Sequence, residues 1–427
     1  MIMNESKFSD SPVVRRHRPN YLIVLYMGLL MLLGLVVIYS IGPQRANVLN
    51  NAYGSEYSET YFFFKQTISL ILALVAFGFM AVIPYNSIIK YSSKLVVFAL
   101  ALCVILALAS LLNLPIAQET GGATRWFNLG FFGSLQPAEI LKFSMLVYLA
   151  GFLGMKYNKG KINDTKDTLL SLGIIMAVAL FFIVVVQRDL GTGISLTGIV
   201  MAMLFIADIN WKNIALILAS VFVVGLLFIV SEPHRIDRVF TFLQGDNTSE
   251  TSDTSSYQIE HAKMAIGAGG FFGLGIGNSV QATGYLPEAI NDSVFAIIGE
   301  TFGFVGLITI LALFVAILME LLKTMDHLID IRLKLLVAGV FGWFASHVIL
   351  NIGSMIGVIP LTGITLPLLS FGGTSMLFIT AALGLVFQLS QYTVHSSRLK
   401  EVSYENSGSR RRFGRSRDTS RGSFKRD

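Results

Sequence analysis

Four places in the sequence combine ionisable or hydroxyl side chains with the edges of apolar segments, where such groups are costly to bury. Asp292 is the sharpest case, because it directly precedes an apolar run. A carboxylate at a boundary between lipid and water can act as a general base if its surroundings tune its pKa. The alternative is a helix N-cap, a position that aspartate favours. Glu300 lies about 12 Å further along a helix, so the two carboxylates cannot flank one bond.

A second set of charges comes earlier in the chain, where Arg125 is followed by Glu139 and Lys142. Pro137 suits the first turn of a helix, and Glu139 and Lys142 are three residues apart, so they share one face of that helix. Two interpretations stay open. The pair neutralises itself internally, or Lys142 and Arg125 face an anionic group such as a phosphate.

The remaining two places are polar breaks between apolar runs. Asp189 begins one run, either as a helix N-cap or in a functional role. Residues 351–375 are dense in glycine, proline and hydroxyl side chains. Such a segment is tolerated at membrane depth only where it lines a cavity, which predicts a polar groove that opens outward.

The elements that must position these side chains are membrane-spanning helices. Of the 427 residues, 54% are apolar and only 14% are charged, against about 25% charged residues in soluble domains. The apolar residues fall in runs of about 20, the length that a helix needs to cross the hydrocarbon core. We therefore predict an all-α, polytopic integral membrane protein with about ten transmembrane helices. The predicted spans are 21–41, 66–84, 94–113, 136–155, 168–186, 190–208, 213–230, 292–322, 333–357 and 371–393.

Lysine and arginine set the predicted orientation, because cytoplasmic loops are enriched in them. With both termini inside, the inner segments carry 24 of the 32. The predicted organisation is a cytoplasmic segment 1–20, a transmembrane domain 21–395, and a basic, disordered cytoplasmic tail 396–427. A large extracytoplasmic loop, 231–291, separates helices seven and eight. The tail shows no folded domain, so nucleic acid is not expected as a partner. Cys103, the only cysteine, excludes disulfides.

Taken in order, these motifs resemble those of the SEDS family, the bacterial shape, elongation, division and sporulation proteins that include FtsW, RodA and SpoVE. The resemblance covers about residues 20–395, and residues 277–279 and 285–289 look more like FtsW and SpoVE than RodA. One departure is Arg188, which stands where the family has proline. The residues that carry the resemblance are Arg125-Trp126, Gln136-Pro137-Ala138-Glu139 with Lys142, Gln187 with residues 189–192, Arg235 with Arg238, Tyr257-Gln258, residues 275–279, Leu286-Pro287-Glu288 with Asp292, and residues 366–373.

This resemblance implies a peptidoglycan glycosyltransferase that polymerises lipid II, an undecaprenyl-pyrophosphate-linked disaccharide pentapeptide, at the outer face of the cytoplasmic membrane during cell division. The family's essential aspartate corresponds to Asp292, with the role of general base in an inverting reaction. A divalent cation, Mg²⁺ or Mn²⁺, could help to hold the pyrophosphate, although the sequence shows no dedicated metal site. The implied substrate-binding residues are Arg125, Gln136, Glu139, Lys142, Asp189, Arg235, Arg238, Glu288 and Ser370.

The resemblance also implies partners and a place in the cell. A class B penicillin-binding protein, which is a single-span transpeptidase, and other division proteins are expected as partners at the septum of the bacterial cytoplasmic (inner) membrane. The alternatives are a lipid II flippase, a RodA-type elongation polymerase and a scaffold without catalysis. A flippase needs polar groups along its whole path, so the outward clustering of the polar motifs favours the enzyme. The presence of Asp292 argues against the scaffold.

Overall fold

Eight helices of the computed structural model are long and apolar enough to cross a membrane, counted over the described residues, which are 17–120, 122–130, 133–219 and 254–394. A shorter apolar helix, α6, adds to these, and the predicted span 213–230 lies largely outside the described residues. The chain is a polytopic, mainly helical membrane protein, as predicted. Its helices are α1 (Tyr21–Tyr53), α2 (Tyr61–Val82), α3 (Tyr85–Leu111), α4 (Pro137–Asn158), α5 (Leu170–Leu180, extended by π-helical turns Thr165–Leu169 and Phe181–Val186), α6 (Leu190–Ile206), α9 (Thr254–Ala268), α10 (Val294–Asp326), α11 (Ile331–Met355) and α12 (Gly373–Leu389).

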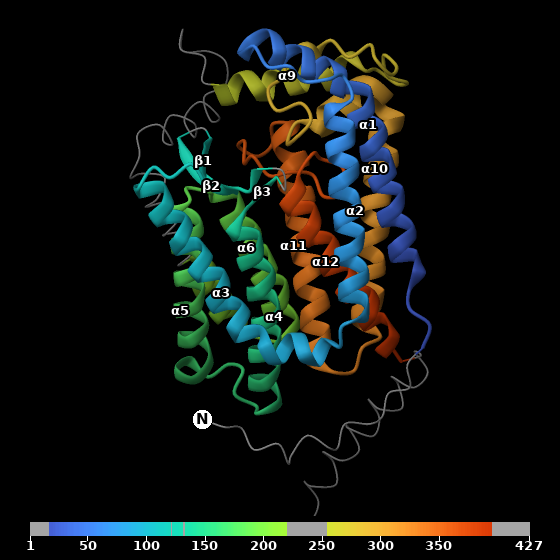
Figure 1. Ribbon diagram of the computed structural model, residues 1–427. Helices are drawn as coiled ribbons and strands as arrows, with labels where there is room; N and C mark the ends of the chain where they lie inside the picture. Colours follow the sequence, from blue (N-terminus) through green and yellow to red (C-terminus); the bar gives the residue numbers. More distant parts are fainter. Residues whose placement is uncertain (1–16, 121, 131–132, 220–253, 395–427) are drawn as a thin grey trace, which may run out of the picture.

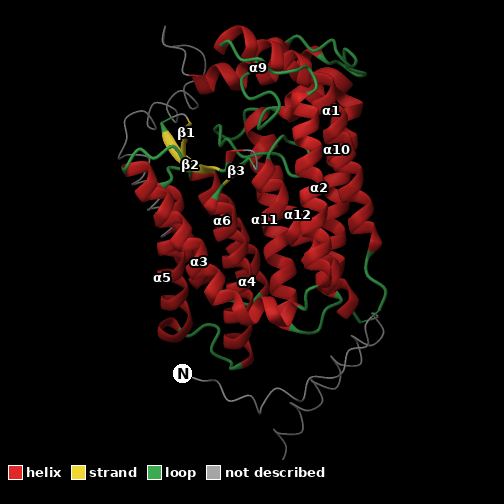
Figure 2. Cartoon of the chain, viewed as in Figure 1, coloured by secondary structure: helices red, strands yellow, loops and turns green. Residues whose placement is uncertain are grey.

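The long helices run side by side in one bundle (Figure 1). α2 packs along α12, α6 along α11 and α3 along α4. Most of α4, α11 and α12 is buried inside the bundle, whereas α2 and α3 turn most of their residues outward. One end, called here the loop-rich end, carries α9 and a small sheet (Figure 2). At the opposite end the two limits of the described chain meet, where the backbone N–H of Asn20 donates to Ser390 Oγ at 2.8 Å.

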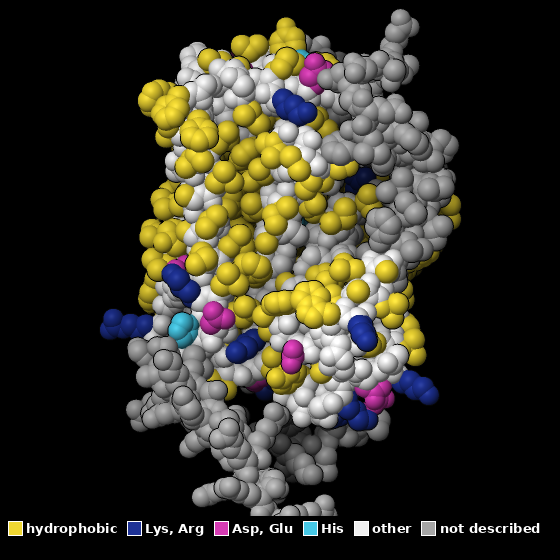
Figure 3. All heavy atoms as spheres, turned by 180° about the vertical axis from the view of Figure 1, so that it is seen from behind, with side chains coloured by type: hydrophobic (Ala, Val, Ile, Leu, Met, Phe, Trp, Pro, Cys, Tyr) yellow, Lys and Arg dark blue, Asp and Glu magenta, His cyan; other side chains and the backbone are white. Residues whose placement is uncertain are grey.

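The surface of the bundle matches a lipid environment. On the face drawn in Figure 3, hydrophobic side chains cover the middle of the molecule, while most of the charged ones gather at the end opposite the loops. Large exposed apolar side chains lie along the whole length of α2, α3 and α10, for example Phe79, Val97 and Ile308. In water such a belt would drive aggregation, so its exposure here fits hydrocarbon as the surrounding solvent.

The first helix is longer than its apolar run. The sequence predicted an outer loop over 42–65, but α1 continues to Tyr53 and ends at Gly54, whose left-handed backbone (φ 64°) closes the helix. Tertiary contacts explain the extension. Ala46 is fully buried, and the Gln44 side chain donates to the Gly277 carbonyl at 3.1 Å. A hydropathy pattern contains no information about such tertiary contacts, so it could not predict the extension of α1.

A three-stranded antiparallel sheet occupies the predicted loop 114–135, which makes the all-α prediction incomplete. Its strands are β1 (Ala117–Thr120), β2 (Ala123–Asn128) and β3 (Ser134–Leu135). Thr120 pairs with Ala123, so a two-residue Gly-Gly connection joins β1 and β2, which is a hairpin signal in the sequence. β3 leads directly into α4, and the Thr374 hydroxyl on α12 donates to the Ser134 carbonyl at 2.6 Å.

The large loop contains α9, which lies across the loop-rich end (Figure 1), followed by a glycine-rich segment that enters a break in α10. Gly303 interrupts α10 with φ 66° and ψ −162°. The N–H groups of Leu274 and Gly275 donate to the Glu300 and Thr301 carbonyls at 2.9 and 3.0 Å, and Phe304 N–H donates to the Gly270 carbonyl at 2.9 Å. The Gly299/Gly303 pair therefore packs against the segment after α9.

Replacing Gly303 should test this break directly. Its backbone conformation is accessible essentially to glycine alone, and a Cβ there would overlap the Gly273 backbone nitrogen. We expect Gly303→Ala to destabilise the protein by about 3 kcal/mol or more, from strain and overpacking together. The measurement is the thermal unfolding midpoint in detergent.

The matched control is Gly28→Ala in the middle of α1, where a Cβ would meet nothing within 4 Å. Alanine favours helix over glycine by about 1 kcal/mol, so this variant should melt at or above the wild-type temperature. Equal melting temperatures for the two variants would contradict the break at Gly303.

Candidate active site

Asp292 lies in the turn that enters α10 at the loop-rich end, and its side chain is almost completely buried. The N-cap of α10 is Ser293, so the interpretation of Asp292 as the N-cap is wrong. One carboxylate oxygen, Oδ1, accepts a hydrogen bond from the Gln258 side chain of α9 at 3.2 Å, and Gln258 also donates to Ser293 Oγ at 2.8 Å. α9 therefore holds the carboxylate from above.

A second contact holds the backbone of the same residue from the bundle. The Asn351 side chain on α11 donates to the carbonyl oxygens of both Asp292 and Ile364, each at 2.7 Å. Asn351 is fully buried, and its Oδ1 has no hydrogen-bond partner among the described residues. The two N–H groups of one amide thus tie the Asp292 turn to the segment that follows α11.

The surroundings of Asp292 make it a stronger base than an ordinary aspartate. Burial raises the pKa of Asp292 to about 7, and the nearby negative charge of Glu288 adds to the rise. Hydrogen bonds from Gln258 and from the backbone N–H groups of Asp292 and Ser293 lower the pKa, but by less. A carboxylate with this pKa exists in both protonation states near neutral pH, which is what general acid–base catalysis requires.

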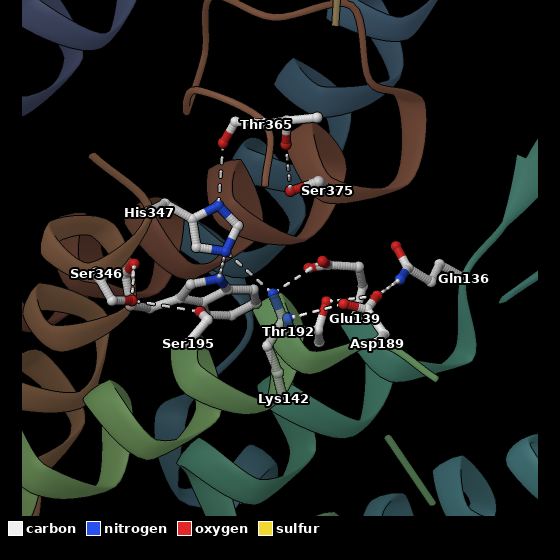
Figure 4. Close-up of polar contacts among 11 residues, drawn as sticks. Gln136, Glu139, Lys142, Asp189, Thr192, Ser195, Ser346, His347, Thr365 and Ser375 are labelled. Carbon is white, nitrogen blue, oxygen red and sulfur yellow. Dashed lines mark hydrogen bonds and ion pairs between the residues drawn. The ribbon is translucent and has the colours of Figure 1, made fainter. Parts of the chain in front are cut away.

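A buried polar cluster lies in the bundle between α4 and α11 (Figure 4). Lys142 Nζ is 2.8 Å from Glu139 Oε1 and 3.1 Å from His347 Nε2, and it lies 4.9 Å from the centre of the Trp343 ring. Lys142 is fully buried. The internal ion pair predicted for Glu139 and Lys142 is confirmed, whereas contact of Lys142 with an anionic substrate stays a prediction.

The cluster fixes the tautomer of His347. Trp343 Nε1 can only donate, and it lies 3.2 Å from His347 Nε2. Lys142 also donates to Nε2, so this nitrogen is the acceptor and Nδ1 carries the proton. Nδ1 then donates to the Thr365 carbonyl at 3.2 Å. His347 therefore links the charged pair to the segment after α11.

Asp189 forms the third part of the same cluster (Figure 4). It is the N-cap of α6, as predicted, because Oδ1 accepts from the Thr192 N–H at 2.9 Å. Oδ2 accepts from the Thr192 hydroxyl at 2.8 Å and from the Gln136 side chain at 3.0 Å. Gln136 and Asp189 thus join the start of α4 to the start of α6.

Residues 362–365 connect this cluster to Asp292. A Cβ on Gly191 of α6 would lie 2.6 Å from the Thr362 carbonyl oxygen, and one on Gly363 would lie 4.0 Å from Asp292 Oδ2. The next two carbonyls are those bound by Asn351 and His347. A cavity of about 10 Å³, room for one water, lies beside this segment and is lined by Thr365–Leu368, Ser370 and the start of α12. The outward groove stays a prediction.

Arg125 lies on β2 and holds the turn before α6. Its guanidinium donates to the carbonyls of Gln187 and Arg188 at 3.4 and 2.8 Å. Arg188 has φ 52°, which proline, fixed near −65°, cannot adopt, so this turn differs from one that contains the family's proline. A cavity of about 300 Å³ lies next to it, between the end of α3 and β2, with Glu119 and Gln187 in its lining.

Two more of the predicted residues, Glu288 and Ser370, are described by the structure. The Glu288 side chain is half exposed, hydrogen-bonded to Asn291, with Arg45 at 3.9 Å. Ser370 is buried, and its hydroxyl accepts from the Leu366 N–H at 2.8 Å, which makes its contact structural. Arg235 and Arg238 lie outside the described residues.

Sequence reasoning missed His347 and Trp343, which complete the cluster. A histidine inside an apolar run is costly in lipid, so the position of His347 alone could have marked it. Within the described ranges, no group of three or more His, Cys, Asp or Glu side chains could hold a metal ion. A divalent cation therefore stays a prediction from the resemblance, and the proposed reaction does not use one.

Comparisons with known proteins agree with this architecture. The chain is 35% identical to the probable peptidoglycan glycosyltransferase FtsW of Aliivibrio salmonicida, over 90% of this chain and 90% of that protein. It is 32% identical to stage V sporulation protein E of Bacillus subtilis, over 89% of this chain and 99% of that protein.

Solved structures share the fold at lower identity. The rod shape determining protein RodA of Thermus thermophilus matches with a TM-score of 0.63 and 22% identity, over 88% of this chain and 98% of that one. A chain of a structure described as "Structural coordination of polymerization and crosslinking by a peptidoglycan synthase complex" matches with a TM-score of 0.68 and 23% identity, over 88% and 99%. The FtsW/RodA/SpoVE cell cycle protein family model matches residues 20–395. The chain belongs to this family.

Proposed function

We infer that this chain is a peptidoglycan glycosyltransferase that polymerises lipid II, with Asp292 as the general base. The single observation that carries the assignment of Asp292 is its burial at the loop-rich end of the bundle, with a pKa raised to about 7. Family membership supplies the reaction class, and relatives at this level of identity bear the name peptidoglycan glycosyltransferase.

The reaction follows from one proton transfer and one displacement. The ionised Asp292 carboxylate takes the proton from the 4-hydroxyl of the acceptor sugar as that oxygen attacks the anomeric carbon of the donor. The bond from the anomeric carbon to the pyrophosphate breaks, and undecaprenyl pyrophosphate leaves with the bonding electrons. Attack from the opposite face turns an α-linked donor into a β-linked glycan. The hydrogen bond from Gln258 to Asp292 Oδ1 orients the carboxylate that takes the proton.

Cationic side chains are proposed to hold the pyrophosphate as its charge grows. Arg125 lies at the loop-rich end, where its guanidinium donates to the carbonyls of Gln187 and Arg188, two residues that line the 300 Å³ cavity. Lys142 is fully buried, so contact with pyrophosphate requires the start of α4 to separate from α11. Glu139 Oε2 is buried without a hydrogen-bond partner in the described part of the chain, so this oxygen can still accept a hydrogen bond. Arg235 and Arg238 remain candidates from the sequence.

The proposed setting is the bacterial cytoplasmic membrane at the division septum, with the loop-rich end outward and both termini in the cytoplasm. The lysines between α4 and α5, such as Lys159 and Lys161, lie at the opposite end, as the positive-inside rule requires. The proposed partners are a class B penicillin-binding protein, which crosslinks the new glycan, and other division proteins. One solved structural neighbour is described as a peptidoglycan synthase complex, which is consistent with such a partner.

Substitution of Asp292 tests the catalytic proposal. Asn preserves the shape of the side chain but cannot take a proton, so Asp292→Asn should lower the rate of lipid II polymerisation by about 100- to 10,000-fold. The assay is the purified protein with lipid II, with glycan products resolved by electrophoresis. The control is Asp326→Asn at the far end of α10, which should polymerise at the wild-type rate.

An Asp292→Asn protein that polymerises as well as wild type would remove the proposed base. If wild type and Asp292→Asn both moved lipid II across vesicle membranes and neither made glycan, the flippase alternative would replace the enzyme.

A double-mutant comparison separates the ion pair from the substrate contact at Lys142. Lys142→Met leaves the Glu139 carboxylate buried without its cation, which should cost about 3–5 kcal/mol. The double variant Glu139→Gln with Lys142→Met should recover most of the lost thermal stability. Glycan synthesis should stay low in both, because neither provides a cation for the pyrophosphate. A double variant with wild-type activity would reduce Lys142 to a structural residue.

A further inference from the structure

Three aromatic rings form an exposed row at the loop-rich end, outside the residues assigned above. Tyr257 and His261 are four residues apart on α9, with ring centres 4.0 Å apart, and the His261 ring lies parallel to that of Tyr285, 6.2 Å away at an angle of 9°. Tyr257 is 37% exposed and Tyr285 54%. These three residues are called here the aromatic row.

The aromatic row is attached to the Asp292 site from two sides. Gln258, the neighbour of Tyr257 and three residues from His261, donates to Asp292 Oδ1. Tyr285 begins the turn that leads into Asp292, and the Ser293 hydroxyl closes that turn by donating to the Pro287 carbonyl at 2.9 Å. The row is therefore carried by the same two elements, α9 and the turn before α10, that hold Asp292.

The chemistry of the row is that of a carbohydrate platform. The axial C–H groups of a pyranose ring make an apolar face that packs on the negative face of an aromatic ring. The polar edge of such a sugar needs hydrogen bonds, which the tyrosine hydroxyls and the imidazole can supply. His261 Nδ1 lies 2.8 Å from the Gln281 Oε1 acceptor and therefore donates to it. Nε2 then remains to accept a hydrogen bond from a sugar hydroxyl.

The two tyrosines of the row are accessible from outside. More than half of the Tyr285 side chain is exposed, while its neighbour Leu286 is buried, so the chain turns its apolar residue inward at this point and its tyrosine outward. Tyr257 is exposed as well, so a ligand can reach both rings.

We propose that Tyr257, His261 and Tyr285 form a binding platform on which sugar rings of the glycan strand stack as they pass the catalytic site. This inference rests on the proposed function for the identity of the strand, and it adds a subsite that contacts sugars beyond the reacting pair. The ligand class is a chain of β-1,4-linked N-acetylhexosamines. The platform raises the affinity for the strand between successive additions, and so it sets the length of the product.

Direct binding tests the platform without requiring polymerisation. The probe is a soluble chitin tetrasaccharide, a β-1,4-linked N-acetylglucosamine chain without lipid or peptide, titrated onto the purified full chain in detergent and followed by saturation-transfer NMR. Tyr285→Ala and Tyr257→Ala should each weaken binding by about fivefold, the size of one aromatic stacking contact. Tyr285→Phe keeps the ring and should bind nearly as wild type does. The control is Tyr157→Ala at the far end of α4, 42% exposed and outside the row, which should bind as wild type does.

A second readout separates the platform from the catalytic proposal. With lipid II as substrate, Tyr285→Ala should couple the first two molecules at a rate within about twofold of wild type but give shorter strands, since one stacking contact acts on strand retention and not on the base. Tetrasaccharide binding that is unchanged in both alanine variants would overturn the platform and leave the glycosyltransferase assignment untouched. If the alanine variants lose tetrasaccharide binding but the wild-type protein makes no glycan from lipid II, the platform stands and the proposed function is rejected. If Tyr285→Ala has a lowered melting temperature, it is compared with Tyr285→Phe. The Phe variant should show the melting temperature and the tetrasaccharide binding of wild type if the ring alone is required.

Discussion

The structure depends on how a stretch of non-helical backbone is satisfied inside the bundle. Between α11 and α12 the chain has no regular helix, and its carbonyls lie among buried helices, where an unpaired carbonyl is costly. Asn351 and His347, both on α11, supply the missing donors to Ile364 and Thr365. Each of these side chains also makes a second contact, since Asn351 binds the Asp292 carbonyl and His347 accepts from Lys142. The need to pair these two carbonyls therefore places both the Asp292 turn and the Lys142 cluster against the segment between α11 and α12.

This arrangement explains how a carboxylate can be buried and still be oriented for chemistry. Asp292 is held at its backbone by Asn351 and at its carboxylate by Gln258, so little rotational freedom remains in the turn. Burial and Glu288 raise the pKa of Asp292, and rigid placement fixes the direction from which a proton can be taken. The same α9 that provides Gln258 carries two rings of the aromatic row, which couples the catalytic turn to the surface along which a strand would run.

Local patterns in the sequence were enough for part of this picture. Apolar runs predicted the spans, and spacing of three predicted the Glu139–Lys142 pair, because both depend on residues near in the chain. The preference of aspartate for N-caps gave the right answer at Asp189 and the wrong one at Asp292, where Ser293 takes that position. The Lys142–His347 contact joins residues 205 apart, and the break at Gly303 is filled by residues that precede α10. No local periodicity encodes contacts of this kind, and the extension of α1 was missed for the same reason.

As the proposed general base, Asp292 must lose its proton before lipid II can be joined, and a pH–rate profile measures this directly. Polymerisation should rise with pH through an apparent pKa near 7, the value to which burial and Glu288 raise the pKa of Asp292. Glu288→Gln removes one negative neighbour, so the Asp292 pKa falls and the rise moves to lower pH. A wild-type profile that is flat around neutral pH, or a rise that stays in place in Glu288→Gln, would contradict the account.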